Sequence, residues 1–163
     1  MIRNLKIKFF LSLLIAVVFG LGLSANANAQ AQRVKAALKG DAATQQPLYT
    51  EYKGVRLGMS AEEARAKLGM PALKGSDQDY YVLSENETAQ ICYDAAQKVI
   101  TISVDYLGGI GAPDYKAVVG GELEQMANGS LYRIVRYESL RFWVSYNRAT
   151  VPVTSVTVTI QRI

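Results

Sequence analysis

Residues 58–71 carry the sequence GMSAEEARAKLGMP. Ser60 is a candidate N-cap, and Glu63 stands three residues later, which is the spacing of a capping box. Small and apolar side chains then recur at helical spacing. Two residues that end a helix and prevent its continuation come next, Gly69 and Pro71. The stretch therefore predicts a short helix over residues 61–68.

Three strand patterns follow this helix. They cover residues 79–84, 88–93 and 98–106, with turn residues between them. The third pattern alternates most clearly. Its apolar set is Ile100, Ile102, Val104 and Tyr106, and its polar set is Thr101, Ser103 and Asp105. Such alternation is typical of an antiparallel sheet with one packed face and one face in water.

The same order of elements recurs in the second half of the chain. Pro113 is placed like the first residue of a helix, and strand patterns follow at 131–137, 141–147 and 154–161. A shift of 51 residues aligns Gly69 with Gly120 and Tyr81 with Tyr132. We expect an α+β fold of two tandem units, about residues 54–106 and 113–161. Each unit is a helix plus three antiparallel strands, and together they form one sheet with short helices packed on one face, in one domain over residues 49–163.

The first 29 residues have the three parts of a secretory signal peptide. Basic residues come first, an apolar run over residues 9–23 follows, and small residues precede Gln30. The alternative is an uncleaved membrane anchor, but the run of about 15 residues is shorter than the roughly 20 that a spanning helix needs. We expect residues 1–29 to be removed on export and residues 30–48 to form a flexible leader. The predicted location is therefore the periplasm or the extracellular space.

The net charge of the chain argues against nucleic-acid binding. The chain has 18 Lys and Arg residues against 14 Asp and Glu. Three of the basic residues lie in the predicted signal peptide, so the remaining chain has 15 against 14, a net charge of +1. A net charge of +1 does not support a prediction of nucleic-acid binding.

The residue inventory also argues against an enzyme. The chain has no histidine and one cysteine, Cys92. A cysteine nucleophile needs an activating group, so Cys92 is interpreted as a small apolar strand residue. Asp77 and Asp79 flank a predicted turn and are compatible with a weak calcium site, although turn chemistry is the commoner reason for such aspartates. We expect no catalytic site, no bound metal and no cofactor.

Residues 54–71 resemble the opening motif of the SmpA/OmlA (BamE-like) domain. The residues that carry this resemblance are Gly58, Met59, Ser60, Glu63, Leu68, Gly69 and Pro71. Tandem versions of that unit are similar to the fold of the secreted β-lactamase inhibitor protein, whose sheet presents an aromatic-rich concave face to its target. The resemblance implies an exported, non-enzymatic protein-interaction module of the bacterial cell envelope, of the kind that takes part in outer-membrane assembly. BamE-like proteins are typically lipoproteins, whereas no lipidation cysteine follows the apolar run of this chain.

Aromatic and arginine side chains predict where such a module binds. We expect Phe142, Val144 and Tyr146 to point inward, and Tyr132 and Ile134 on the preceding strand to do the same. The residues then left on the water-facing side are Tyr80, Arg133, Tyr137, Arg141 and Trp143. Trp, Tyr and Arg are the side chains most common in binding hot spots. A single bulge would exchange the two faces of a strand and bury Trp143 instead.

Two other functions remain open on the sequence. The first alternative to an envelope module is a secreted inhibitor of an extracellular hydrolase such as a β-lactamase. A third possibility is an envelope protein that binds a small ligand or lipid between its helices and its sheet. The predicted partner is accordingly an envelope protein or an extracellular hydrolase. Contact with a membrane is expected only indirectly or through an uncleaved signal peptide.

Overall fold

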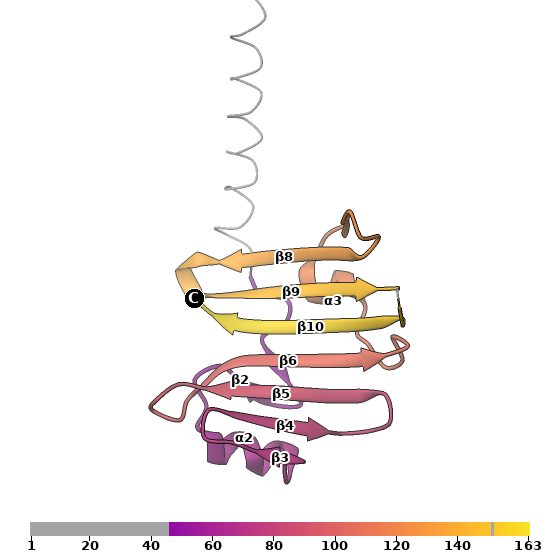
Figure 1. Ribbon diagram of the computed structural model, residues 1–163. Coiled ribbons are helices and arrows are strands. Elements are labelled where there is room, and N and C mark those ends of the chain that lie inside the picture. The colour runs from indigo at the N-terminus through magenta and orange to yellow at the C-terminus, as the bar shows by residue number, and fades with distance from the viewer. Residues whose placement is uncertain (1–45, 151) are drawn as a thin grey trace, which may run out of the picture. The chain divides into compact units, whose positions relative to one another are not determined.

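The computed structural model describes residues 46–150 and 152–163, and an antiparallel sheet of eight strands dominates them (Figure 1). The strands of this sheet are β3 (Leu73–Lys74), β4 (Gln78–Val82), β5 (Glu87–Tyr93), β6 (Val99–Leu107), β7 (Glu124–Gln125), β8 (Leu131–Tyr137), β9 (Phe142–Ala149) and β10 (Ser155–Arg162). Their spatial order is β3-β4-β5-β6-β10-β9-β8-β7. A separate hairpin pairs β1 (Glu51–Tyr52) with β2 (Val55–Arg56), and the helices are α2 (Ala61–Leu68), α3 (Tyr115–Val119) and the 3₁₀ turn η1 (Glu138–Leu140). The predicted signal peptide and most of the predicted leader lie outside the described residues.

The expected α+β class is wrong, because the described part of the chain is mostly β. Its two α-helices have eight and five residues, and each buries only two side chains. They are too short to form a helical layer over eight strands, and the β1–β2 hairpin also contributes the buried side chains Tyr52 and Val55 to the core. The pattern also did not predict β1, β2, β3 and β7. Strands of two residues are too short to show the alternation that identifies a strand in a sequence.

The predicted helix and the six longer strands are confirmed, with strand ends within two residues of those expected. Ser60 and Glu63 form the capping box that the sequence predicts. The Ser60 hydroxyl accepts a hydrogen bond from the Glu63 N–H at 3.2 Å, and the Ser60 N–H donates to Glu63 Oε2 at 2.7 Å. In the second helix, Pro113 is not the first helical residue. Asp114 is the N-cap, and its side chain accepts from the Lys116 N–H at 2.8 Å.

The core lies on one face of the sheet and crosses the junction between β6 and β10. In the register of these strands Val104 lies opposite Val158, and Ile102 lies opposite Ile160. The largest fully buried apolar side chains include Tyr81, Ile91, Ile102, Val144 and Ile160. Because cross-strand partners share a face, five neighbouring strands, β4, β5, β6, β10 and β9, contribute to one continuous apolar layer.

A β-bulge changes the predicted alternation at the start of β6. Tyr93 pairs with Val99 and Cys92 pairs with Thr101, so Ile100 is the extra residue. Val99 is fully buried in its place, and Ile100 is only half-buried. The expectation that Ile100 lies in line with Ile102 is therefore wrong, while the inward direction of Ile102, Val104 and Tyr106 is confirmed.

Candidate protein-binding surface

The two faces of the sheet differ sharply. Both α-helices and the β1–β2 hairpin contribute to one side, which we call the covered face, and Figure 1 shows α3 and β2 behind the sheet. On the opposite side, the uncovered face, no described helix or hairpin lies over the strands. Its centre carries short hydroxyl side chains of β6 and β10. Ser103 Oγ lies 3.1 Å from Thr159 Oγ1, and Thr157 Oγ1 donates to Asp105 Oδ1 at 2.6 Å.

Larger side chains gather on the uncovered face where β8 pairs with β9. Trp143 lies opposite Arg136, Ser145 lies opposite Ile134, and Asn147 lies opposite Tyr132. Arg136 is exposed, and the other large side chains are half-buried. We call this group the Trp143 surface, and it consists of Tyr132, Ile134, Arg136, Trp143 and Asn147. It combines two aromatic rings, an aliphatic side chain and a guanidinium group without a described element above them.

Trp143 and Tyr80 are the predicted site residues that lie on the uncovered face, but they do not meet. Tyr80 is on β4, and three strands separate β4 from β9. At about 4.8 Å between neighbouring strands, the two side chains stand about 19 Å apart across the sheet. Tyr80 therefore belongs to a different part of the face from Trp143.

The predicted direction of β8 is wrong. Val135 lies opposite the buried Val144, and Arg133 and Tyr137 lie opposite Tyr146 and Phe142. These β8 side chains therefore point to the covered face, and Tyr132 and Ile134 point to the uncovered one. Tyr137 is 3% exposed, and its ring centroid is 5.0 Å from that of Phe142. It is part of the core.

Arg133 holds the chain segment that precedes β7. Its Nη1 donates to the Glu122 carbonyl at 3.2 Å, and its guanidinium group lies against Gly121. A Cβ at Gly121 would lie 2.8 Å from the guanidinium carbon, so a larger residue there would displace the Arg133 side chain from this contact. The Arg133 side chain therefore contacts a loop on the covered side and does not lie on the predicted binding face.

Arg141 lies in the connection from β8 to β9. Its backbone is left-handed, with φ 57°, and its N–H donates to the Glu138 carbonyl at 3.2 Å. The side chain is exposed and forms no ion pair with the described residues. The structure thus places Arg141 directly before β9, near the end of the sheet that carries Trp143 and Arg136.

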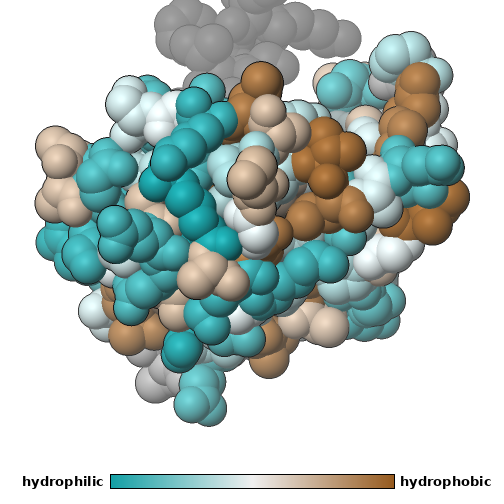
Figure 2. All heavy atoms as spheres, turned by 90° about the horizontal axis from the view of Figure 1, so that it is seen from below, coloured by the Kyte–Doolittle hydropathy of each residue, from teal (hydrophilic) through white to brown (hydrophobic). Residues whose placement is uncertain are grey.

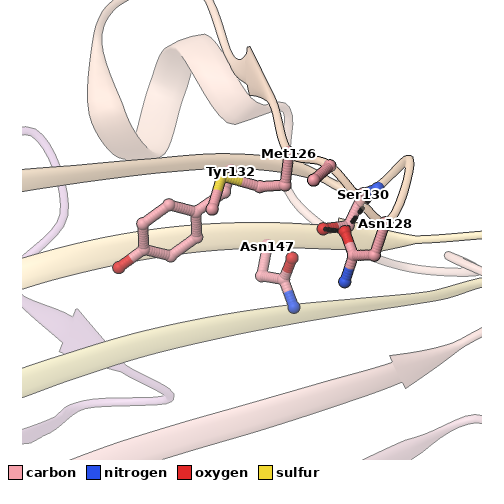
Figure 3. A pocket seen from close by; sticks show the side chains of 6 residues that line it. Met126, Asn128, Ser130, Tyr132 and Asn147 are labelled. Atoms are coloured by element: carbon pink, nitrogen blue, oxygen red, sulfur yellow. Dashed lines mark hydrogen bonds between the residues drawn. The ribbon is translucent and has the colours of Figure 1, made fainter.

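A hollow of about 400 Å³ extends the Trp143 surface toward the β7–β8 turn (Figure 3). It is lined by Met126, Ala127, Asn128, Ser130, Tyr132 and Asn147. Asn128 Oδ1 accepts from the Ser130 N–H at 3.1 Å and from Ser130 Oγ at 2.6 Å, which fixes the turn. The Asn128-Gly129 turn was predictable, but nothing in the sequence indicated that Met126 and Asn147 would meet there. The lining carries no charge, so it suits neutral polar or apolar groups.

Asp79 is not a turn or calcium residue but a buried ion-pair partner. Its side chain is 0% exposed, and Arg65 of α2 donates to its two oxygens at 2.7 and 3.2 Å. Tyr93 donates to the same carboxylate at 2.7 Å, and Tyr81 Oη lies 3.4 Å away. Within the described residues no group of three or more His, Cys, Asp or Glu side chains is arranged to hold a metal ion.

Cys92 is half-buried on the uncovered face of β5. Burial raises the pKa of its thiol, and the negative charge of Asp77 raises it further. The thiolate is the nucleophilic form of cysteine, and these surroundings disfavour it.

No helix among the described residues is long and apolar enough to cross a membrane. Comparison of the chain with protein-family models, with curated proteins and with solved structures finds no match.

Proposed function

We propose that this protein is an exported protein-binding module of the bacterial cell envelope that docks its partner on the Trp143 surface. The observation that carries the proposal is the position of Trp143, half-buried beside the exposed Arg136 on a sheet face that no described helix or hairpin covers. Export is inferred from the composition of residues 1–29, and the place in the envelope from the BamE-like character of residues 54–71.

The chemistry of the Trp143 surface suits a protein partner. Trp and Tyr offer large rigid contact areas with a polar tip, and Arg pairs with carboxylates or stacks on rings. Hot-spot residues of this kind work best when a rim of polar contacts excludes water around them. The hydroxyl-rich strip of β10, which includes Thr157 and Thr159, borders the Trp143 surface and provides such a rim.

The groups best suited to catalysis have other roles or unfavourable surroundings. The buried carboxylate of Asp79 is occupied by Arg65 and Tyr93. Burial raises the pKa of the Cys92 thiol, which disfavours the nucleophilic thiolate. Binding therefore explains the arrangement with fewer assumptions than catalysis does.

Site-specific photo-crosslinking in the native cell tests this function. A photoreactive amino acid at position 147 lies on the Trp143 surface, and one at position 82 lies at the far end of the same face as the matched control. We expect position 147 to capture one envelope protein, position 82 not to capture it, and Trp143→Ala to abolish the capture. Equal capture from both positions, or capture that survives Trp143→Ala, would contradict the proposal.

Cell fractionation in the same experiment separates the envelope from the alternative location. An envelope module is recovered in the envelope fraction together with its captured partner. Recovery in the medium, with inhibition of an extracellular hydrolase in a panel of β-lactamases and proteases, would instead indicate a secreted inhibitor.

A further inference from the structure

Among the described residues, strand β8 is a sheet edge over most of its length. Strand β7 pairs only with Leu131 and Tyr132. Residues 133–137 have β9 on one side and no described strand on the other, and β8 is the outermost labelled strand at this end of the sheet in Figure 1. An edge of this kind presents a row of backbone groups that a further strand can use.

Two residues of β8 direct their backbone groups outward. In the β7–β8 hairpin the Met126 N–H donates to the Ser130 carbonyl at 2.8 Å, and Tyr132 is the next residue of β8 whose backbone faces β7. By the alternation of an antiparallel strand, the N–H and C=O groups of Ile134 and Arg136 face the same way. Within residues 46–150 and 152–163 these four groups have no hydrogen-bond partner.

Residues 133–141 carry a net positive charge, whereas β7 places the acidic Glu124 opposite Tyr132 at the start of β8. Residues 133–141 contain three arginines, Arg133, Arg136 and Arg141, against the single acid Glu138. None of the three arginines forms an ion pair with the described residues. Arg136 points to the uncovered face next to Trp143, so a carboxylate in a neighbouring strand would lie within its reach.

The opposite edge of the sheet offers much less. Strand β3 pairs with Asp79 and Tyr80 of β4, and the Gly75 N–H already donates to the Gln78 carbonyl at 2.8 Å. By the same alternation only Val82 of β4 keeps outward backbone groups. Figure 2 looks at this end of the molecule, where hydrophobic groups form separate patches between hydrophilic ones.

We infer that the partner binds by adding an extended, acidic segment to the edge of β8. The segment pairs with the backbone of Ile134 and Arg136, and its alternate side chains lie on the uncovered face beside Arg136 and Trp143. Main-chain bonds then supply affinity, and the charge of the edge selects acidic segments. This inference rests on the proposed function and specifies the chemistry of the partner at the same surface.

Selection and amide hydrogen exchange test the inference. A phage-displayed library of short random peptides is selected on the protein as it is purified from cells, whether or not residues 1–29 have been removed. The strongest binder is then synthesised as the probe. We expect the probe to be rich in Asp and Glu. The amides of Ile134 and Arg136 should exchange freely in the unbound protein and at least about tenfold more slowly with the probe bound. The Val135 amide, which faces β9, should be protected in both states.

A proline variant separates strand addition from docking on the face. Ile134→Pro removes an outward N–H and leaves the β8–β9 bonds in place, which an edge strand tolerates. The matched control is Val82→Pro at the opposite edge. We expect Ile134→Pro to weaken probe binding at least about tenfold more than Ile134→Ala, which removes the same side chain from the Trp143 surface but keeps the N–H. Val82→Pro should leave binding unchanged, and circular dichroism verifies the fold of all three variants.

The remaining outcomes overturn the inference in distinguishable ways. If Trp143→Ala abolishes binding while the Ile134 and Arg136 amides stay unprotected, the partner docks on the face without adding a strand, and the proposed function stands. Protection that appears without the probe and increases with protein concentration assigns the edge to a second copy of this chain. If neither the photo-crosslink nor the probe depends on Trp143, the proposed function fails together with the inference.

Discussion

Arg65 and Asp79 form a two-point ion pair between helix α2 and strand β4, on the covered face of the sheet. Arg65 Nε and Nη2 donate to the two carboxylate oxygens at 2.7 and 3.2 Å, and the guanidinium carbon lies 5.6 Å from the centroid of the Tyr93 ring. The carboxylate is 0% exposed, whereas the arginine side chain keeps some contact with water. The helix is therefore attached to the sheet through a buried charge as well as through Ala61 and Ala64.

Removing Arg65 should be strongly destabilising, because it leaves Asp79 buried without its countercharge. We expect Arg65→Ala to lower the free energy of unfolding by about 3–5 kcal/mol, the usual cost of breaking a buried pair. Urea unfolding measures it. The control is Arg56→Ala, whose contact with Glu51 at 3.6 Å lies between exposed side chains and should be worth about 0–1 kcal/mol. Equal losses in the two variants would show that burial of the Asp79 pair carries no energetic weight.

The same pair predicts how stability depends on pH. Burial by itself would raise the pKa of Asp79, but hydrogen bonds from Arg65 and Tyr93 and the charge of Arg65 hold the pKa below its ordinary value of 3.8. The unfolded chain therefore binds a proton at this site more readily than the folded one. This contribution to stability is complete above the unfolded-state pKa and is lost as the pH falls through the folded-state pKa.

Unfolding at a series of pH values below neutrality measures this effect. The parent should lose stability more steeply in the acidic range than Asp79→Asn, which has no carboxylate to protonate at that position. Glu63 and Glu122, whose pKa values are also lowered, titrate in both proteins and so cancel in the comparison. Parallel curves for the two proteins would mean that Asp79 keeps an ordinary pKa.

The capping box of α2 should contribute a smaller and local effect. Ser60→Ala removes the hydroxyl that accepts from the Glu63 N–H, and the typical cost of losing such a cap is about 1 kcal/mol. Ser139→Ala is the matched control, because Ser139 is exposed and lacks a hydrogen bond of this kind within the described chain. Chemical denaturation of the two variants measures the difference between their free energies of unfolding. Equal values would show that the Ser60 cap does not stabilise the helix that begins at Ala61.

Much of the fold could be predicted because its causes are local. The capping box and stop residues of Ala61–Leu68 act within one turn of helix, and the alternation of Ser155–Arg162 identifies a half-buried strand without knowledge of its neighbours. Strands β3 and β7 have no local cause of this kind. They form only because hairpin turns bring two residues beside an existing edge.

The candidate site was harder to predict because it depends on pairing. In β8 the residues Tyr132 and Ile134 are as apolar as Val135 and Tyr137, so both faces of the strand carry hydrophobic side chains. The register with β9, which places Val135 opposite Val144, decides which face is buried. The role of Asp79 likewise depends on Arg65, a partner 14 residues away in another element.

Tyr137 and Trp143 should now separate into a core residue and a surface residue. Tyr137 is nearly fully buried against Phe142, so Tyr137→Ala should cost about 3–5 kcal/mol, as for other large aromatic residues in a core. Trp143 is only half-buried on the uncovered face, so Trp143→Ala should cost clearly less in urea unfolding and retain the native circular dichroism spectrum. A larger loss for Trp143 than for Tyr137 would contradict the assignment of Tyr137 to the core and of Trp143 to the surface.

Trp143 also provides a direct optical probe of the proposed surface, because it is the only tryptophan in the chain. In the unbound protein its half-buried ring should be quenched by acrylamide. A partner or an acidic segment seated beside Arg136 should shift the emission to shorter wavelength and reduce the quenching, because it removes water from the ring. Arg136→Glu should abolish both changes by repelling acidic side chains, whereas Arg56→Glu on the separate β1–β2 hairpin should leave them intact. Binding that leaves the emission and quenching of Trp143 unchanged would place the partner elsewhere on the molecule.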